Sequence, residues 1–435
     1  MAGSSGVGRA LRHRNYRLFF SGQSISLIGT WLTRVATSWL VYRLTGSAWM
    51  LGVVGFWGQF PTFLLAPVAG VWVDRWNRHR ALVVTQILAA IQSGLLALLA
   101  LTGRITVRDV IFLSIFQGLI NAVDMPARQS FVVEMVEDRE DLPNAIALNS
   151  SMFNAARLIG PSVAGLLIAW VGEGWCFLID AVSYLAVIAS LLAMKVAPPA
   201  RARRPGRIWN EIGEGFRYVS GFAPIRAVLL LLSLVSLLGM PYIVLMPIMA
   251  GRVLHGGPHT LGFLMASSGL GALSGALYLA TRRTVLGLGR VIAFAAGGFG
   301  IGLAAFSLSR TIWLSIPLMA LCGLSGIVMM ASSNTVLQTL TDDDKRGRVM
   351  SFYSMAFFGM APLGSLIAGS LASGIGAPQT ILVGGLACVL GALLFFRKIP
   401  ALRKFARPVY ARLGILPGPD EVGGRASAVT MPPES

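Results

Sequence analysis

Four charged side chains lie within long apolar stretches of this sequence, namely Arg34, Asp124, Arg157 and Asp180. A charge inside a bilayer costs at least about 2.5–3.5 kcal/mol on insertion scales, so these residues are the first candidates for chemistry. A carboxylate can bind a proton, and a nearby arginine can compete with that proton for it. At about 1.5 Å of helix per residue, Arg157 is the arginine nearest in depth to Asp124, and Arg34 is the nearest to Asp180. We therefore predict proton coupling at Asp124, with Arg157 and Arg34 as the candidate basic residues.

Alternatives remain open for both acids. Arg128 follows Asp124 by one helical turn, so these two side chains could form a purely structural ion pair. Asp180 is expected to be structural. The second half of the chain has no acid inside its apolar segments, so proton coupling is expected in the first half.

Helices that cross a membrane are the elements expected to position these residues. Hydrophobic residues make up 55% of the 435 residues, charged residues make up 12%, and the mean hydropathy is +0.71. A bilayer core of about 30 Å needs about 20 apolar residues per helix. Twelve segments meet this length approximately: 18–42, 49–73, 81–101, 110–127, 145–171, 175–194, 227–249, 261–279, 291–308, 313–336, 350–371 and 381–396.

The net charge of +18 follows the loops rather than one patch. Most Lys and Arg residues fall in the even-numbered loops and in both tails, and the positive-inside rule assigns these parts to the cytoplasm. The sequence therefore predicts a multi-pass protein of a bacterial inner membrane with both termini cytoplasmic. The basic charge is interpreted as topology, and no nucleic-acid partner is expected.

The segments divide into two halves of six, which predicts an all-α polytopic fold of two pseudo-symmetric bundles. A shift of 204 positions places Gly160 on Gly364 and Gly165 on Gly369. Parallel repeats of this kind form a binding site at their interface and rock about it. The predicted divisions are an N-terminal segment 1–17, bundles 18–194 and 227–396, a linker 195–226, and a partly disordered cytoplasmic tail 397–435.

The loop between the second and third segments carries a specific motif. It reads Gly-Val-Trp-Val-Asp-Arg-Trp-Asn-Arg-His-Arg and resembles the loop signature of the major facilitator superfamily, with Asn77 in place of a glycine. Asn77 is expected to tolerate the positive φ of a tight turn. The resemblance implies a latch that holds the halves in the outward-facing state, and a plain basic turn is the alternative. The latch residues would be Gly70, Asp74, Arg75, Arg78 and Arg80.

The fifth segment contains Gly160, Pro161, Ala164 and Gly165, which resemble the Gly-Pro-x-x-Gly-Gly motif of exporters and antiporters in that superfamily. Small residues allow close helix packing, and a proline bends a helix, so Gly160, Pro161 and Gly165 are predicted to form a gate. Ordinary packing is the alternative.

Further strings narrow the resemblance to the enterobactin-exporter-like branch of major facilitators. They read Asn-Ala-Val-Asp-Met-Pro-Ala-Arg-Gln from Asn121 and Phe-Asn-Ala-Ala-Arg from Phe153. The resemblance covers about residues 10–400 and implies export of siderophores or drugs. The cargo cavity is expected between the first, fourth, seventh and tenth segments, although packing is the alternative role for each residue. Its candidates are Gln23, Ser26, Trp31, Gln117, Asn121, Met240, Tyr242, Met246, Met329 and Met330.

Other classes of function are disfavoured. No histidine lies in an apolar segment, and there is no phosphate-binding loop, so an enzyme is not expected. His255 and His259 are separated by Gly-Gly-Pro, which does not support a metal site, and no cofactor is expected. The sequence predicts a proton-coupled exporter of a small organic molecule that works as a monomer in the lipid bilayer. A non-transporting sensor or assembly factor, or a lipid flippase, is the alternative.

Overall fold

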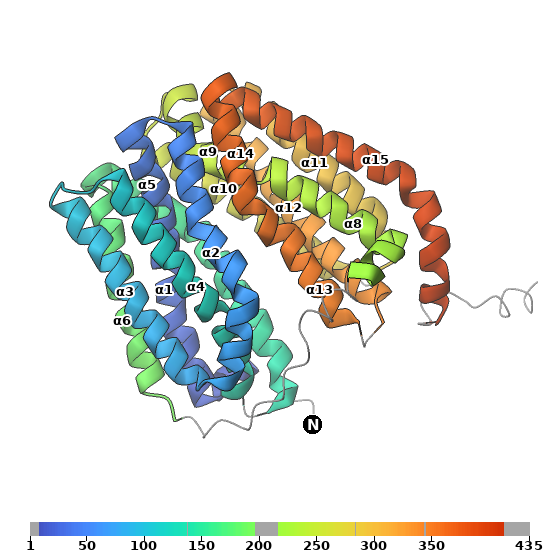
Figure 1. Ribbon diagram of the computed structural model, residues 1–435, viewed down its shortest axis with the longest axis horizontal. Coiled ribbons are helices and arrows are strands. Elements are labelled where there is room, and N and C mark those ends of the chain that lie inside the picture. The colour runs from blue at the N-terminus through green and yellow to red at the C-terminus, as the bar shows by residue number, and fades with distance from the viewer. Residues whose placement is uncertain (1–7, 137, 196–215, 283, 343–344, 413–435) are drawn as a thin grey trace, which may run out of the picture.

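The computed structural model describes residues 8–136, 138–195, 216–282, 284–342 and 345–412, and they form a bundle of long helices (Figure 1). Among them, the side chains of 66–68, 70, 71, 74, 75 and 139 are not described. The predicted linker therefore falls largely outside the described residues, as do the first seven residues and the end of the tail.

Six helices make up the first half, and their ends follow local sequence signals. Ser47 caps the second helix by accepting a hydrogen bond from the backbone N–H of Met50, and Thr106 forms a capping box with Asp109. Gly46 ends the first helix in the left-handed region with φ 58°. The helices are α1 (Arg14–Thr45), α2 (Ala48–Arg75), α3 (Arg78–Leu101), α4 (Val107–Met135), α5 (Leu142–Val171) and α6 (Glu173–Leu192).

The second half repeats this plan with two interrupted helices. Short π-helical turns divide its first and fifth spans, and Pro247 lies inside the first of these spans. Wide turns of this kind interrupt the regular helical ladder, often at functional sites. The elements are α8 (Ala223–Leu234), η3 (Val235–Gly239), α9 (Tyr242–Ile248), η4 (Met249–Val253), α10 (Pro258–Thr281), α11 (Leu288–Leu308), α12 (Ile312–Leu340), α13 (Arg346–Ser354), η5 (Met355–Gly359), α14 (Met360–Ile375) and α15 (Ala377–Arg412).

The structure confirms the predicted all-α membrane fold. Eleven stretches of the described residues are long and apolar enough to cross a membrane. Helix α1 is as long as these but less apolar, because it carries Gln23, Arg34 and several hydroxyl side chains. With α1 as the first span, the order of the helices matches the twelve predicted segments.

One predicted boundary was wrong. The last helix was expected to end near residue 396, whereas α15 continues to Arg412. Ile399 and Ala406 on this extension are buried in the main apolar core, which explains why the helix continues past Pro400.

The two halves pack against each other through glycines at one end of the bundle. A Cβ atom on Gly165 of α5 would lie 2.9 Å from the Cα of Gly262 on α10, and one on Gly52 of α2 would lie 2.9 Å from the Cα of Gly369 on α14. Figure 1 shows the two bundles inclined to each other. These contacts lie at the end of α1–α6 opposite Arg14, so the halves are closed at that end.

Gly165→Leu is expected to weaken this closure, because overpacking a tight contact costs about 1–3 kcal/mol. A cost of that size shifts a two-state equilibrium by about tenfold. The readout is labelling of Ser365→Cys, whose side chain faces Gly55, by a membrane-impermeant maleimide. Gly94→Leu is the matched control, since a Cβ there would meet nothing within 4 Å. Equal labelling in both variants would contradict a closure held by the glycine contacts.

Candidate functional site

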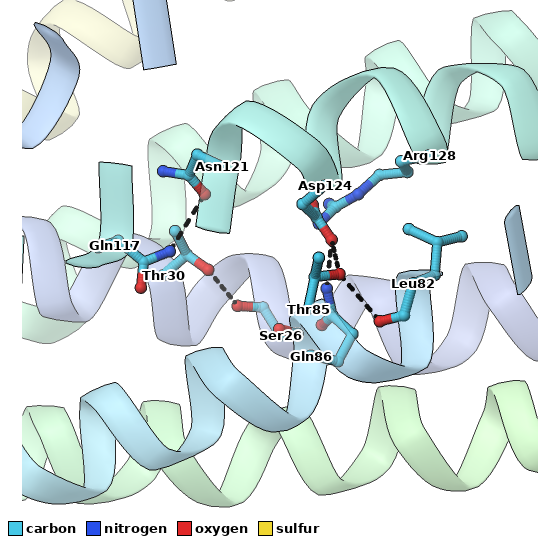
Figure 2. Close-up of polar contacts among 9 residues, drawn as sticks. All are labelled: Ser26, Thr30, Leu82, Thr85, Gln86, Gln117, Asn121, Asp124 and Arg128. Carbon is cyan, nitrogen blue, oxygen red and sulfur yellow. Dashed lines mark hydrogen bonds and ion pairs between the residues drawn. The ribbon is translucent and has the colours of Figure 1, made fainter. Parts of the chain in front are cut away.

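Asp124 lies at the centre of a buried polar cluster between α3 and α4 (Figure 2). Its side chain is 4% exposed. One carboxylate oxygen, Oδ1, accepts hydrogen bonds of 2.8 Å from Thr85 Oγ1 and of 2.8 Å from Gln86 Nε2. The other oxygen, Oδ2, forms an ion pair with Arg128 one turn further along α4. A charge-assisted bond and two further donors compensate the burial of this carboxylate.

The predicted pairing of Asp124 with Arg157 was wrong in this conformation. Depth along the membrane axis gave the expected pair, but depth says nothing about the direction in which a side chain points. Helix α4 packs on α2 and α3, whereas α5 packs on α1 and α10, so Asp124 and Arg157 face different neighbours. The proposed role of Asp124 in proton coupling remains a prediction.

Asp180, unlike Asp124, has no basic partner among the described residues. It is 1% exposed on α6, and its Oδ2 accepts a hydrogen bond of 2.9 Å from Ser93 Oγ. Its Oδ1 has no hydrogen-bond partner among the described residues, and it lies 2.7 Å from where a Cβ on Gly29 would be. No ion pair joins it to Arg34 in the described part of the chain, so that predicted pairing was also wrong.

The two deep arginines lie instead where the halves face each other. The guanidinium of Arg34 on α1 stacks over the ring of Trp31, 4.8 Å from its centroid. Arg157 on α5 is close enough to both Arg34 and Tyr242 of α9 to interact with them electrostatically. Phe153 on α5 meets Trp31 edge to face, with ring centroids 6.0 Å apart. The site therefore combines two cations with aromatic rings from both halves.

The helix-five glycines take part in this packing. A Cβ on Gly160 would collide with the side chain of Trp31, and one on Gly165 would lie 2.7 Å from the carbonyl oxygen of Pro258. Pro161 is buried inside the unbroken α5. Gly160 and Gly165 are therefore needed for close contact with α1 and α10, and their movement as a gate remains a prediction.

Several of the predicted cargo residues make contacts within the protein in this conformation. Gln117 Nε2 donates to Asn121 Oδ1 at 3.1 Å within α4 (Figure 2). Gln23 is buried, Met246 belongs to the main apolar core, and the hydroxyl of Tyr242 lies 3.3 Å from Ser268 Oγ. A cavity of about 640 Å³ lies between α3 and α4, and none of the predicted cargo residues lines it. Their contact with cargo remains a prediction.

The latch loop is described only in part. Gly70 and the side chains of Asp74 and Arg75 lie outside the described part, Arg80 is exposed, and Arg78 Nη1 lies 2.5 Å from Glu134 Oε1 on α4. Asn77 has φ −69° and caps α3 by accepting a hydrogen bond of 3.0 Å from the backbone N–H of Arg80. The expected positive φ at Asn77 was therefore wrong, since an asparagine at this position serves as a helix cap.

Two contributors, Glu134 and Phe153, were given no role from the sequence, and a third was predicted only as an alternative. Arg128 was expected only as the alternative partner of Asp124, and the i, i+4 spacing was the signal that favoured it. Glu134 and Phe153 were not singled out, because each is an ordinary residue at the end or on the face of an apolar helix.

Arg128→Ala is expected to destabilise the protein strongly, because removing one partner of a buried ion pair typically costs about 3–5 kcal/mol. Adding Asp124→Asn should restore much of the loss, since the carboxylate left without its partner is then neutral. Thermal unfolding of the purified protein in detergent measures both effects. Arg108→Ala, at an exposed position of the same helix, is the control. A double variant as unstable as Arg128→Ala alone would contradict the importance of the pair.

The comparisons with known proteins agree on one family. The family described as transmembrane secretion effectors matches residues 7–410. The staphyloferrin A transporter of Staphylococcus aureus is 24% identical over 346 residues, which are 78% of this chain and 85% of that protein. The multidrug efflux pump Tap of Mycolicibacterium fortuitum is 27% identical over 386 residues, 86% of this chain and 93% of that protein. The enterobactin exporter EntS of Citrobacter koseri is 24% identical over 400 residues, 91% and 94% of the two chains.

Solved structures agree on the fold. A mutant form of the nucleoside transporter NupG superposes with a TM-score of 0.71 at 12% identity, covering 89% of this chain and 99% of that one. The helices and the relatives together indicate a multi-pass inner-membrane transporter of small molecules and not an enzyme. The chain belongs to the transmembrane secretion effector family, of the enterobactin-exporter type within the major facilitator superfamily.

Proposed function

We propose that this chain exports a small siderophore-like or drug-like molecule by alternating access, in exchange for protons. The observation that carries this proposal is the packing of two similar bundles through glycine contacts at one end. Close contacts near one end, as at Gly52 and Gly165, allow two bundles to rock, so that the interface opens to either side in turn. Relatives named as an enterobactin exporter and a multidrug efflux pump support the outward direction.

The proposed topology assigns the closed end of the bundle to one side of the membrane. If the N-terminal end of α1 is cytoplasmic, the closed end of the bundle faces outward. The structure then represents the inward-open state, in which cargo enters from the cytoplasm. The loop with Asp74 and Arg75 acts as the latch of the opposite, outward-open state.

Proton coupling is proposed at Asp124, with Arg128 in the role first given to Arg157. A proton on the carboxyl group removes the negative charge that holds Arg128. Thr85 and Gln86 bind the same carboxylate from α3, so its protonation weakens the contact between α3 and α4. Exchange of the proton for this ion pair is the proposed link between the proton gradient and helix movement.

Retention of siderophores and lipophilic dyes in producing cells tests the export proposal. We expect the wild type to lower the retention of at least one compound, and both a protonophore and Asp124→Asn to restore it. Asp109→Asn is the control, because Asp109 lies at the solvent-exposed start of the same helix. If Asp124→Asn still exports the compound as the wild type does, the coupling role is refuted. If the wild type lowers the retention of no compound, a sensor, an assembly factor or a flippase becomes the better explanation.

A further inference from the structure

Two cationic side chains, Arg34 and Arg157, approach each other inside the molecule without a carboxylate beside them. They come from α1 and α5 and lie on either side of Trp31. Arg34 stacks on the ring of Trp31. Arg157 lies one turn from Phe153 and one turn from Gly160, and both of these residues contact Trp31. Within the described residues, neither guanidinium forms a hydrogen bond or an ion pair, and Arg34 contacts the face of Trp31. Arg34 is exposed in this conformation, so its guanidinium group is accessible to a ligand.

An unpaired pair of like charges at this depth is costly. Arginines inside membrane proteins almost always pair with an acid or line a path for a ligand. The two deep acids of the chain are already engaged, since Asp124 holds Arg128 and Asp180 accepts a hydrogen bond from Ser93. The second half cannot supply a partner, because its apolar segments contain no acid. The missing negative charge must therefore come from outside the chain.

The surroundings of the two arginines match a particular kind of organic anion. A guanidinium binds a carboxylate through two parallel hydrogen bonds, and it keeps its charge at any physiological pH. Trp31 and Phe153 add aromatic surface next to the charges, and Tyr242 adds a ring from the second half. Such surfaces suit the apolar or planar part of a small molecule.

We propose that Arg34 and Arg157 form the anion-binding part of the cargo site and that the cargo carries at least one carboxylate, with its apolar part against Trp31 and Phe153. This inference rests on the proposed export function, because the bound molecule is taken to be the exported one. It adds the sign of the charge on that molecule. A bound carboxylate cancels the repulsion between the two guanidinium groups and ties α1 to α5. A cationic molecule would increase that repulsion.

Binding to the purified protein in detergent tests the proposal without any transport assay. Carboxyfluorescein and rhodamine 6G share a xanthene ring system but carry opposite charges, so fluorescence anisotropy of the two dyes isolates the effect of charge. We expect carboxyfluorescein to bind, citrate to displace it, and rhodamine 6G to bind more weakly. Arg34→Gln and Arg157→Gln should each weaken carboxyfluorescein binding by about tenfold or more, because a hydrogen bond to a charged group is lost.

Two controls separate this site from the basic surface of the protein. Arg17→Gln removes an exposed charge from the same helix as Arg34 and should leave dye binding unchanged. The double variant Arg34→Gln with Arg157→Gln should melt close to the wild type, since neither arginine has an acidic partner among the described residues and only the Arg34–Trp31 contact is lost. A melting temperature lowered as strongly as by Arg128→Ala would mean that the arginines have an acidic partner in the protein, which contradicts the proposal.

The remaining outcomes are equally decisive. The proposal fails if neither carboxyfluorescein nor citrate binds, if rhodamine 6G binds as tightly as carboxyfluorescein, or if both arginine variants bind as the wild type does. Carboxylate binding at the two arginines without any measurable export would refute the export function alone. Export of cations without carboxylate binding would refute the anion site alone.

Discussion

The placement of charge in a medium that does not solvate it is the constraint on which the rest of this structure depends. Each deep charge needs compensation, and the chain supplies it unevenly. Asp124 forms an ion pair with Arg128 and accepts two hydrogen bonds from polar side chains. Asp180 accepts one hydrogen bond from a hydroxyl group, and it fits against α1 because Gly29 has no side chain. Arg34 stacks on Trp31, and among the described residues neither Arg34 nor Arg157 forms an ion pair with an acid. This imbalance separates a compensated cluster in the first bundle from an uncompensated one where the bundles meet.

A rocking movement of the bundles would affect the Asp124 cluster and the arginine cluster differently, because they lie on different helices. Asp124 lies between α3 and α4, inside one bundle, where a proton can change the packing without touching the cargo. Arg157 lies on α5, which carries Gly165 and packs on α10 of the other bundle. The proposed cargo site at Arg157 is therefore next to the contact that would open and close, whereas the proposed proton site would act through the helices of the first bundle.

Much of the architecture could be predicted from the sequence, because the length of each apolar segment and the alternation of basic loops are imposed by the bilayer. The contacts between helices could not. Depth along a helix is readable from residue number, but rotation about the helix axis decides whether Asp124 meets Arg128 or Arg157. The cap at Asn77 and the extension of α15 depended on local hydrogen bonding and on burial of Ile399 that composition does not reveal.

Phe153 and Glu134 illustrate the same limit on the prediction of the site. Both have types that are common on membrane helices, and only their neighbours, Trp31 and Arg78, give them a role. The motif residues were recognisable because the family resemblance supplied their context. The unpaired state of the two arginines was not recognisable, since it is a property of everything around them.

A structure determined by cryo-electron microscopy in the presence of a saturating polycarboxylate such as citrate tests the central claim most directly. We predict density for the anion between the guanidinium groups of Arg34 and Arg157, with Asp124 still bound to Arg128. Density that instead joins Asp124 to Arg157, with no anion between the two arginines, would contradict it.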